Sequence, residues 1–511
     1  MPRPCCIHAE DLGENFSQVA GRSRFLCLPS GGPVCDEGGV TSLRNILVCL
    51  MTLMSGLSLL GQAPTPAQLF LLTQQARTAF TVQGAGARAT GTGGAFIAIA
   101  DDATAVSFNP AGLGQLLRPE VSLVVNGASR DLNFTGFTGQ GPNAPTTFED
   151  TANTDRSISP SFASFAVPWK HEGRNFVFLM SYQRFFDFTY DSSVDYLATT
   201  NGGATVQAIS QRIHQTGGVD LYSAAIGADL TPRLLLGVSL NSWQGRSSFS
   251  SFSQRTTSGV NVQFDSNLAQ ASVFHGFNAT LGLIWRSQWL NLGLTYRTPY
   301  TATYSFSNRY DYIDNKTGLL TQSAGPGTSC ALKWPETLGI GLGLHLGPRG
   351  LLTLDSSRTP WSQARYSGSA LDGLNWFDFQ ANTATKDTTD FHLGGEWIAW
   401  LGDKLVVPLR AGVFREPQPI VDTTTGAQRV LLGWTLGSGA KFKDMTVDLA
   451  LKISHDQRGI SRYNTDSPIG GIASSALGTE HLEERRVVLS VIYQLDAERV
   501  RRALSWLFIG S

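Results

Sequence analysis

The sequence predicts an all-β fold: a transmembrane antiparallel β-barrel of about fourteen strands, with an N-terminal hatch that plugs its lumen. Three features predict it. Residues 119–495 contain many stretches in which apolar residues alternate with small or polar ones, and the connections between these stretches are short and long in turn. A stretch rich in Gly and Ala, residues 84–116, precedes them and carries almost no bulky charge. Barrel strands alternate lipid-facing and lumen-facing residues, and their periplasmic turns are shorter than their external loops.

The composition of the 511-residue chain fits a barrel and argues against two other classes of protein. Charged residues make up 15% of the chain, against about 25% in soluble domains. Hydrophobic residues make up only 42%, which excludes a helical membrane bundle but suits strands that are apolar on one face. The net charge of -1 gives no support for a nucleic-acid partner.

We interpret residues 1–43 as a mis-assigned leader and residues 44–67 as a signal peptide. The first segment has no periodic pattern, and its cysteines lack the spacing of a metal site. In the second, Arg44 precedes an apolar run of about fifteen residues, which is short for a transmembrane helix and typical of a signal-peptide core. Cleavage near residue 67 would leave Cys330 as the remaining cysteine, so no disulfide framework is expected.

Residues 68–118 are predicted to form the hatch. Gly93 and Gly94 allow positive φ and a close approach of the backbone to another chain segment. Asp101 and Asp102 can cap a helical turn or bond their own backbone, a role that we favour over metal binding. The sequence therefore predicts a plug without a metal ion.

The hatch ends in the motif Asn109-Pro110-Ala111. Proline disfavours the α region for the residue before it, so a helix is expected to end near Phe108. The Asn109 side-chain amide can then bond backbone groups that a turn leaves unpaired. The motif therefore has the chemistry to hold the hatch in place.

The beginning of the same stretch, Gly84-x-Gly86-x-x-Ala89, loosely matches a dinucleotide-binding fingerprint. That fingerprint requires a strand before it and a βαβ unit around it. Here polar residues precede it and hairpin-like strands follow. We therefore reject nucleotide binding and expect no cofactor.

The strand prediction rests on period-two alternation, which an amphipathic helix does not show. In residues 290–296, Leu or Tyr at even positions alternates with Asn, Gly and Thr at odd ones. A soluble all-β protein is the weaker alternative, because nothing would make its connections alternate in length.

Residues 496–511 would form a C-terminal tail. We place strands near 119–128, 158–168, 174–187, 220–229, 233–246, 271–286, 289–303, 336–346, 350–358, 389–398, 404–415, 430–442, 445–455 and 486–495.

Aromatic residues cluster where the strands would meet the headgroup region of a membrane, a position that suits amphipathic rings. Taken one by one, ordinary strand aromatics are an equal alternative. The predicted girdle consists of Trp169, Trp285, Trp289, Trp397, Trp400, Phe185 and Phe186.

Residues 84–113, GAGARATGTGGAFIAIADDATAVSFNPAGL, resemble the start of the FadL/TodX-type outer-membrane transporters of hydrophobic compounds. Weaker similarities, such as Trp334-Pro335-Glu336, extend the resemblance toward residue 495. It implies a hatch inside a fourteen-stranded barrel in the bacterial outer membrane, seated with the help of the Asn-Pro-Ala motif. It also implies a kinked third strand that opens a lateral gap beside the hatch. Residues 175–186 contain no Gly or Pro, so no kink is visible in this sequence.

The long connections carry apolar side chains that could capture a ligand. In the family that the chain resembles, the matching loops form an external groove, where an apolar ligand would gain about 0.8 kcal/mol per buried CH₂. Packing of the loops onto each other is an equal alternative. The candidate ligand-binding residues are Phe249, Phe252, Phe264, Tyr304, Phe306 and Tyr312.

Two further candidates, Arg297 and Arg410, are predicted to face the lumen and could bind a carboxylate head group. Pairing with lumen acids such as Asp448 is the favoured interpretation, because buried charges must be paired. The two arginines are nevertheless the candidate ligand-binding residues of the lumen.

The resemblance and the apolar loops together predict passive, hatch-gated uptake of long-chain fatty acids or similar hydrophobic compounds. Expected partners are outer-membrane lipid, lipopolysaccharide and the barrel-assembly machinery, and the protein is expected to be a monomer. Two alternatives stay open: a similar barrel used as a scaffold or shuttle in protein secretion, and a general diffusion porin. No set of Ser, His and a polar partner is visible, so no enzyme is predicted.

Overall fold

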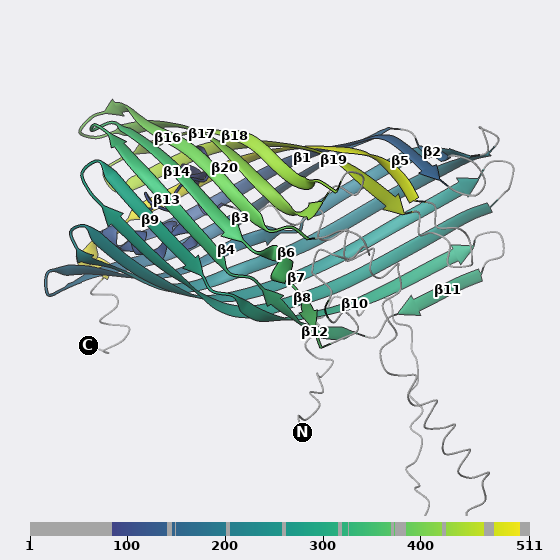
Figure 1. Cartoon of the computed structure of the whole chain (residues 1–511), viewed down its shortest axis with the longest axis horizontal. Helices are drawn as coiled ribbons and strands as arrows, with labels where there is room; N and C mark the ends of the chain where they lie inside the picture. The colour runs from purple at the N-terminus through teal and green to yellow at the C-terminus, as the bar shows by residue number, and fades with distance from the viewer. Residues whose placement is uncertain are drawn as a thin grey trace, which may run out of the picture. The chain divides into compact units, whose positions relative to one another are not determined.

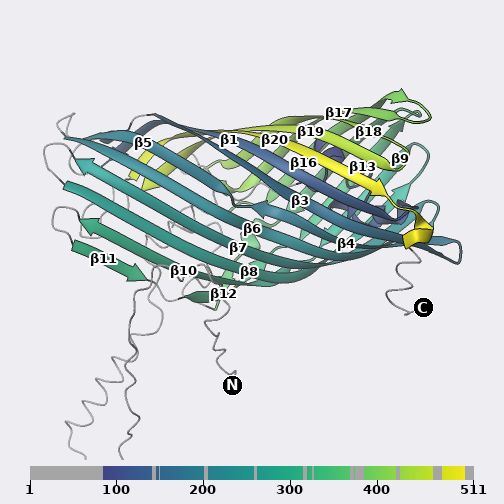
Figure 2. The same ribbon diagram turned by 180° about the vertical axis from the view of Figure 1, so that it is seen from behind.

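The computed structural model describes residues 84–140, 146–148, 150–200, 205–257, 262–314, 319–324, 327–368, 373, 385–421, 426–463 and 475–500. The predictions for the leader, the signal peptide, hatch residues 68–83 and tail residues 501–511 lie outside these ranges. The described residues form one closed antiparallel sheet (Figures 1 and 2), in which the first long strand pairs with the last. Among them, no helix is both long and apolar enough to cross a membrane.

The sheet forms a barrel of fourteen antiparallel strands, which confirms the predicted fold class. Several barrel strands consist of two or three segments that follow one another along the wall. The segments are β1 Glu120–Gln140, β2 Thr146–Phe148, β3 Thr151–His171, β4 Arg174–Asp187, β5 Tyr190–Thr200, β6 Thr205–Thr231, β7 Leu234–Thr257, β8 Val262–Arg286, β9 Leu290–Arg297, β10 Tyr300–Asp314, β11 Leu319–Ala324, β12 Thr328–Trp334, β13 Thr337–Leu346, β14 Gly350–Thr359, β15 Tyr366–Ser367, β16 Thr388–Leu401, β17 Val406–Val421, β18 Gln428–Lys441, β19 Met445–Tyr463 and β20 Ser475–Gln494.

Several strands are much longer than predicted. β6 has 27 residues, β7 has 24 and β8 has 25, whereas about 10 residues suffice to cross a bilayer. Most of the predicted loops at 188–219, 247–270 and 304–335 are therefore strand. The prediction failed there because it followed apolar residues on the outer face, and that pattern ends where lipid ends although backbone pairing continues.

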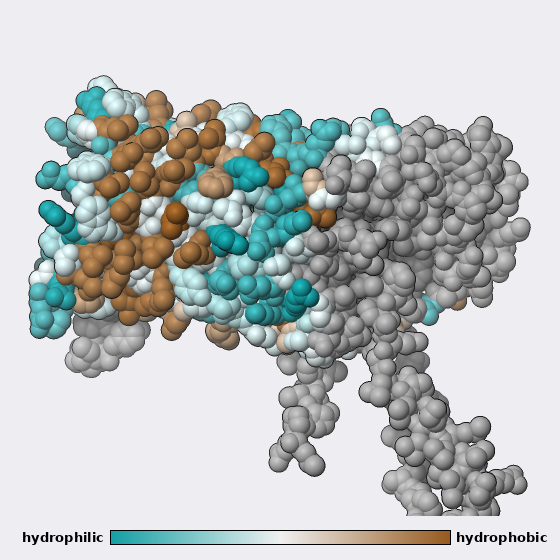
Figure 3. Space-filling view, viewed as in Figure 1, coloured by the Kyte–Doolittle hydropathy of each residue, from teal (hydrophilic) through white to brown (hydrophobic). Residues whose placement is uncertain are grey.

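The outer wall carries the apolar side chains that the alternation predicted. On β7, Leu236, Val238 and Leu240 point outward and are exposed. Figure 3 shows apolar residues gathered near the short-turn end of the strands, with hydrophilic residues beyond them. Aromatic rings line that end too, and those exposed there include the predicted girdle residues Trp169, Trp289, Trp397 and Trp400.

Phe185 and Phe186 do not belong to the girdle, which corrects the prediction. The β4–β6 ladder has a bulge between Arg184 and Phe186, and a bulge allows consecutive side chains to share one face. Both rings are buried in the lumen. The glycines that make room for the bulge lie on the neighbouring strand: Gly217 has φ +102°, and a Cβ on Gly218 would collide with the carbonyl oxygen of Phe186.

The same irregularity separates β3 from β4. Their ladder runs from His171 opposite Arg174 to Phe162 opposite Gln183 and stops there, although β3 continues to Thr151. Beyond that point side chains connect the two strands, as when Ser159 Oγ donates to Asp187 Oδ2 over 3.2 Å. The third barrel strand is thus interrupted, which the absence of Gly and Pro from residues 175–186 did not indicate.

Candidate functional site

The described part of the hatch, residues 84–118, fills the barrel near its short-turn end. It contains two short helices, α3 Ala87–Gly91 and α4 Ala105–Phe108, and a 3-10 segment, η2 Pro110–Gln115. Helix α4 ends at Phe108 as predicted, because Asn109 before the proline is extended with φ −150°. The buried apolar residues of the hatch and of the inner wall form one cluster. The plugged lumen of the predicted fold is confirmed.

Asn109 ties the hatch to itself and to two strands. Its Oδ1 accepts from the amide of Ala111, and its Nδ2 donates to the carbonyl of Ile97 over 3.0 Å. The same Nδ2 lies 3.1 Å from the carbonyl oxygen of Leu283 on β8 and 3.3 Å from that of Leu294 on β9. One fully buried side chain therefore closes the Pro110 turn and fixes it to the wall.

Glycines stand on the wall at many of the positions where the hatch backbone comes closest. A Cβ at any of these positions would lie within 3.0 Å of hatch atoms, closer than Cβ atoms approach in practice. Gly237, for example, faces the Pro110–Ala111 peptide, and Gly394 faces the carbonyl of Thr92. We call this set the glycine belt: Gly227, Gly237, Gly282, Gly293, Gly341, Gly394, Gly412 and Gly437, on β6, β7, β8, β9, β13, β16, β17 and β18.

Gly93 and Gly94 are the hatch's own points of close approach. Their φ angles are +73° and +88°, and a Cβ at either would collide with β16. The amide of Gly93 donates to Thr435 Oγ1 over 3.0 Å, and the Nδ1 of His392 lies 2.7 Å from the Gly93 carbonyl oxygen. The predicted need for positive φ and close backbone contact is met at both positions.

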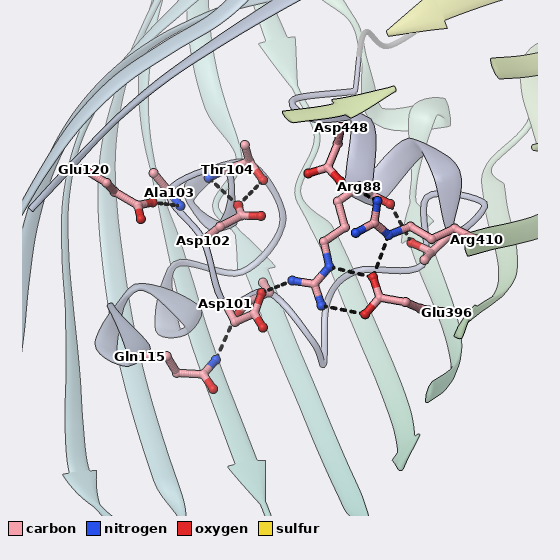
Figure 4. A network of polar contacts seen from close by, with 12 residues as sticks. Arg88, Asp101, Asp102, Ala103, Thr104, Gln115, Glu120, Glu396, Arg410 and Asp448 are labelled. Carbon is pink, nitrogen blue, oxygen red and sulfur yellow. Dashed lines mark hydrogen bonds and ion pairs between the residues drawn. The ribbon is translucent and has the colours of Figure 1, made fainter. Parts of the chain in front are cut away.

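A network of ion pairs joins the hatch to β16, β17 and β19 (Figure 4). Glu396 Oε2 lies 3.1 Å from the Nε of Arg88 and 2.6 Å from the Nε of Arg410. Arg410 also pairs with Asp448 over 2.6 Å, and Arg88 pairs with Asp101. Burial lowers the pKa of Arg88, but the carboxylates of Asp101 and Glu396 outweigh it and raise that pKa well above its usual value. Arg410 is thus paired with two carboxylates, and one of them, Glu396, also binds Arg88 of the hatch.

Asp102 bonds local backbone, the role favoured for it from the sequence. Its Oδ1 accepts from the amide of Thr104 over 2.8 Å. Burial, followed by the charge of Asp101, raises the pKa of Asp102 to about 6. Among the described residues, no group of three or more His, Cys, Asp and Glu side chains could hold a metal ion.

Beyond the hatch, toward the long connections, aromatic side chains meet across the lumen. Trp334 on β12 has its ring centroid 6.2 Å from that of Phe186 on β4, although several strands separate the two along the sheet. The ring centroid of Trp334 also lies 5.6–6.1 Å from those of Trp243, Phe274 and Tyr300. We call Phe185, Phe186, Trp243, Phe274, Tyr300 and Trp334 the aromatic cluster.

Arg297 lies between the glycine belt and the aromatic cluster, on β9 beyond Gly293. Its guanidinium carbon is 5.2 Å from the ring centre of Phe185 and 5.8 Å from that of Trp243. Within the described residues no carboxylate pairs with it, and its buried Nε has no hydrogen-bond partner. The Tyr300 hydroxyl, also buried, has no hydrogen-bond partner there either. The two candidate lumen arginines therefore differ: Arg410 is neutralised by protein carboxylates, and Arg297 is not.

The comparisons with known proteins identify the family. The model of the family described as "Outer membrane protein transport protein (OMPP1/FadL/TodX)" matches residues 69–466. The chain belongs to this family. No curated protein sequence matches it. As a FadL/TodX family member, it is a non-enzymatic outer-membrane channel for hydrophobic compounds.

Solved structures share the fold of this FadL/TodX family member. A FadL homologue from Pseudomonas aeruginosa has a TM-score of 0.55 and 15% identity, with 82% of this chain and 100% of that chain covered. The toluene transporter TodX from P. putida has a TM-score of 0.50 and 15% identity, with 81% of this chain and 99% of that chain covered. At such identities the likeness concerns the fold alone.

The candidate ligand-binding residues of this FadL/TodX family member lie on strands, not in loops, and separate by position. Phe249 on β7 and Tyr304 and Phe306 on β10 are buried, the last two against the aromatic cluster. Phe252 is 38% exposed and shares the outward parity of Leu240. Phe264 and Tyr312 lie on β8 and β10, and their side chains fall outside the described residues.

Sequence reasoning missed most of the aromatic cluster in this FadL/TodX family member. Trp243, Phe274, Tyr300 and Trp334 were not singled out as ligand-binding candidates. A usable signal existed: on β7, Trp243 has the opposite parity to the outward Leu240. Large aromatic rings at lumen-facing parity were therefore detectable, whereas their convergence from strands far apart in the sheet was not.

Proposed function

We propose that this protein takes up long-chain fatty acids, or similar hydrophobic compounds with one anionic end, by passive diffusion past the hatch. The observation that carries the proposal is Arg297, whose buried Nε has no hydrogen-bond partner and which pairs with no described carboxylate, beside the aromatic cluster. A buried unpaired charge is costly, and a carboxylate is the partner that a guanidinium binds best. An incoming head group would supply it.

The aromatic cluster supports the apolar part of the same ligand. Each CH₂ moved from water to the rings contributes about 0.8 kcal/mol, so a long chain gains more than a short one. A neutral aromatic hydrocarbon would match the rings equally well but would leave Arg297 unpaired. The anionic amphiphile is therefore the better fit.

The route beyond the cluster must pass the hatch, since the hatch blocks the lumen. The interruption between β3 and β4 starts beside Gln183, whose Oε1 accepts from the hatch residue Ser107 over 2.8 Å. The hatch thus reaches the place where the wall lacks backbone pairing. This supports a lateral exit there, and the outward apolar face supports monomeric insertion among outer-membrane lipids and lipopolysaccharide.

Cellular uptake of dodecanoate and dodecane tests the proposal, in a Gram-negative host that lacks its own fatty-acid transporter. Arg297→Met removes the charge at similar length, Arg297→Lys keeps it, and Arg309→Met alters an exposed arginine as a control. We expect Arg297→Met to lower dodecanoate uptake about tenfold, the scale of a charged hydrogen bond, and to spare dodecane. If Arg297→Met took up dodecanoate as fast as the parent protein does, head-group recognition by Arg297 would be excluded.

A further inference from the structure

Three buried polar side chains on β1 and β3 have hydrogen-bonding atoms that no described residue satisfies. Asn126 is 2% exposed, and neither its Nδ2 nor its Oδ1 has a partner. The hydroxyls of Ser122 and Ser164 are also buried and unpartnered, although the two residues stand opposite each other in the β1–β3 ladder. We call Asn126, Ser122 and Ser164 the polar seam.

The polar seam runs along the inner wall beside the hatch. Val124 lies between Ser122 and Asn126 on the same face of β1 and belongs to the apolar cluster that includes the hatch. Because β1 rises about 3.3 Å per residue, Asn126 lies roughly 13 Å from Ser122 along the strand. The seam therefore offers hydrogen-bonding positions at two levels beside the hatch, with the Ser122–Ser164 pair nearer the short-turn end.

The seam differs in chemistry from its charged neighbours. Farther along β1, Arg130 pairs with Glu484 over 2.9 Å and Asp155 over 3.1 Å and donates to the carbonyl of Thr189 over 3.0 Å, so its charge is matched. The seam itself carries no charge. Asn126 can both donate and accept, and so can a serine hydroxyl. These groups match a neutral head that does the same, such as an alcohol or a protonated carboxylic acid.

Leaving these atoms unsatisfied is unfavourable, because a buried polar group without a partner costs much of its hydration energy. No described residue supplies these partners, so a guest molecule that does so would be bound favourably there. We propose that the polar seam binds the uncharged head group of an amphiphile in transit, at Asn126 or at the Ser122–Ser164 pair, while its apolar chain lies against Val124. This inference rests on the proposed uptake of amphiphiles.

The test compares uptake of dodecanol, which has no charge, with uptake of dodecane. Asn126→Leu keeps the side-chain volume but removes both polar atoms. The paired change Ser122→Ala with Ser164→Ala tests the lower position. Ser239→Ala removes a buried, unpartnered hydroxyl from β7, outside the seam, and is the matched control. Because dodecanol cannot form an ion pair with Arg297, its uptake tests the seam separately from the ion pair proposed for dodecanoate.

We expect Asn126→Leu to lower dodecanol uptake about fivefold, the scale of one or two hydrogen bonds, and to leave dodecane uptake unchanged. Its thermal unfolding temperature should stay the same or rise, since unsatisfied buried atoms are lost. Unchanged dodecanol uptake means that the seam holds water only and overturns the inference, as does an equal fall for both solutes. A parent protein that takes up neither solute nor dodecanoate overturns the proposed function as well.

Discussion

The hatch meets two different walls. Across the glycine belt it contacts the barrel backbone against backbone, and the Asn109 amide satisfies the carbonyls exposed there. Across β1 and β3 it meets side chains, and the polar seam is left with unsatisfied atoms. The first wall leaves no room for a solute or for hatch movement without collision. The second has buried polar atoms without described partners, so a guest is expected to bind along it.

Removal of the hatch should have the largest effect, because it removes the contacts with both walls at once. A barrel of fourteen strands has a lumen too wide for its own wall side chains to fill. We expect deletion of residues 84–116 to convert a nearly closed barrel into a conducting one in planar bilayers. Conductance that stays at the parent level would show that the hatch does not close the lumen.

Gly237→Leu should disrupt the glycine-belt wall alone. Its Cβ would collide with the Pro110–Ala111 peptide, and such overpacking costs about 3 kcal/mol or more. We expect the hatch to become sensitive to protease and single-channel conductance to rise. Gly127→Leu on β1 is the control, because a Cβ there has its nearest neighbour at 3.8 Å, on the side chain of the outward Ile158. Equal behaviour of the two variants would contradict the proposed role of the belt.

Glu396→Gln should loosen the hatch through its ionic contacts. The substitution removes the carboxylate that Arg88 and Arg410 share but leaves Arg88 with Asp101 and Arg410 with Asp448, so we expect a loss of about 1.5–3 kcal/mol, the scale of a hydrogen bond to a charged group. Arg88→Met should cost less, because Glu396 keeps its ion pair with Arg410, and Asp101, which loses its partner, is exposed to solvent. Denaturant unfolding of both variants measures the difference, and a greater loss for Arg88→Met would argue against the network as described.

The smallest effect expected is one of pH. Because the pKa of Asp102 in the folded hatch is about 6, above its unfolded value, protonation favours the docked state. The resulting stabilisation should be complete at about pH 4 and disappear as the pH rises through 6. Protease protection of the hatch, followed from pH 4 to 8, should show this change, and Asp102→Asn should reduce it. If the hatch of the parent protein were better protected from protease at pH 8 than at pH 5, the predicted direction of the pH effect would be wrong.

Local sequence predicted the hatch and the fold well. The end of α4 at Phe108 follows from the steric effect of Pro110 on the residue before it, and the positive φ of Gly93 and Gly94 follows from glycine itself. The strands follow from alternation at period two. The family resemblance over residues 84–113 also came from local sequence, because these residues must fit closely against the glycines of the wall.

The site was less predictable, and Arg297 and Arg410 illustrate why. Both are arginines on barrel strands, and the sequence offers each the same two roles. Arg410 is neutralised because Glu396 stands opposite it on β16 and Asp448 reaches it from β19, two strands away on the other side. Arg297 has aromatic rings there instead. Register between strands decided the difference, and it cannot be read from the residues next to each arginine in the sequence.

The sequence by itself determined that this chain forms a plugged barrel, because period-two alternation and proline or glycine stereochemistry act over a few residues. Tertiary structure alone decided where the strands end, which face Phe186 takes and which polar groups are left unsatisfied. The bulge that turns Phe186 inward depends on glycines of another strand, and the seam exists because β1 and β3 meet the hatch with unmatched atoms. Such outcomes arise from contacts between distant segments, which appear only once the barrel has closed around its hatch.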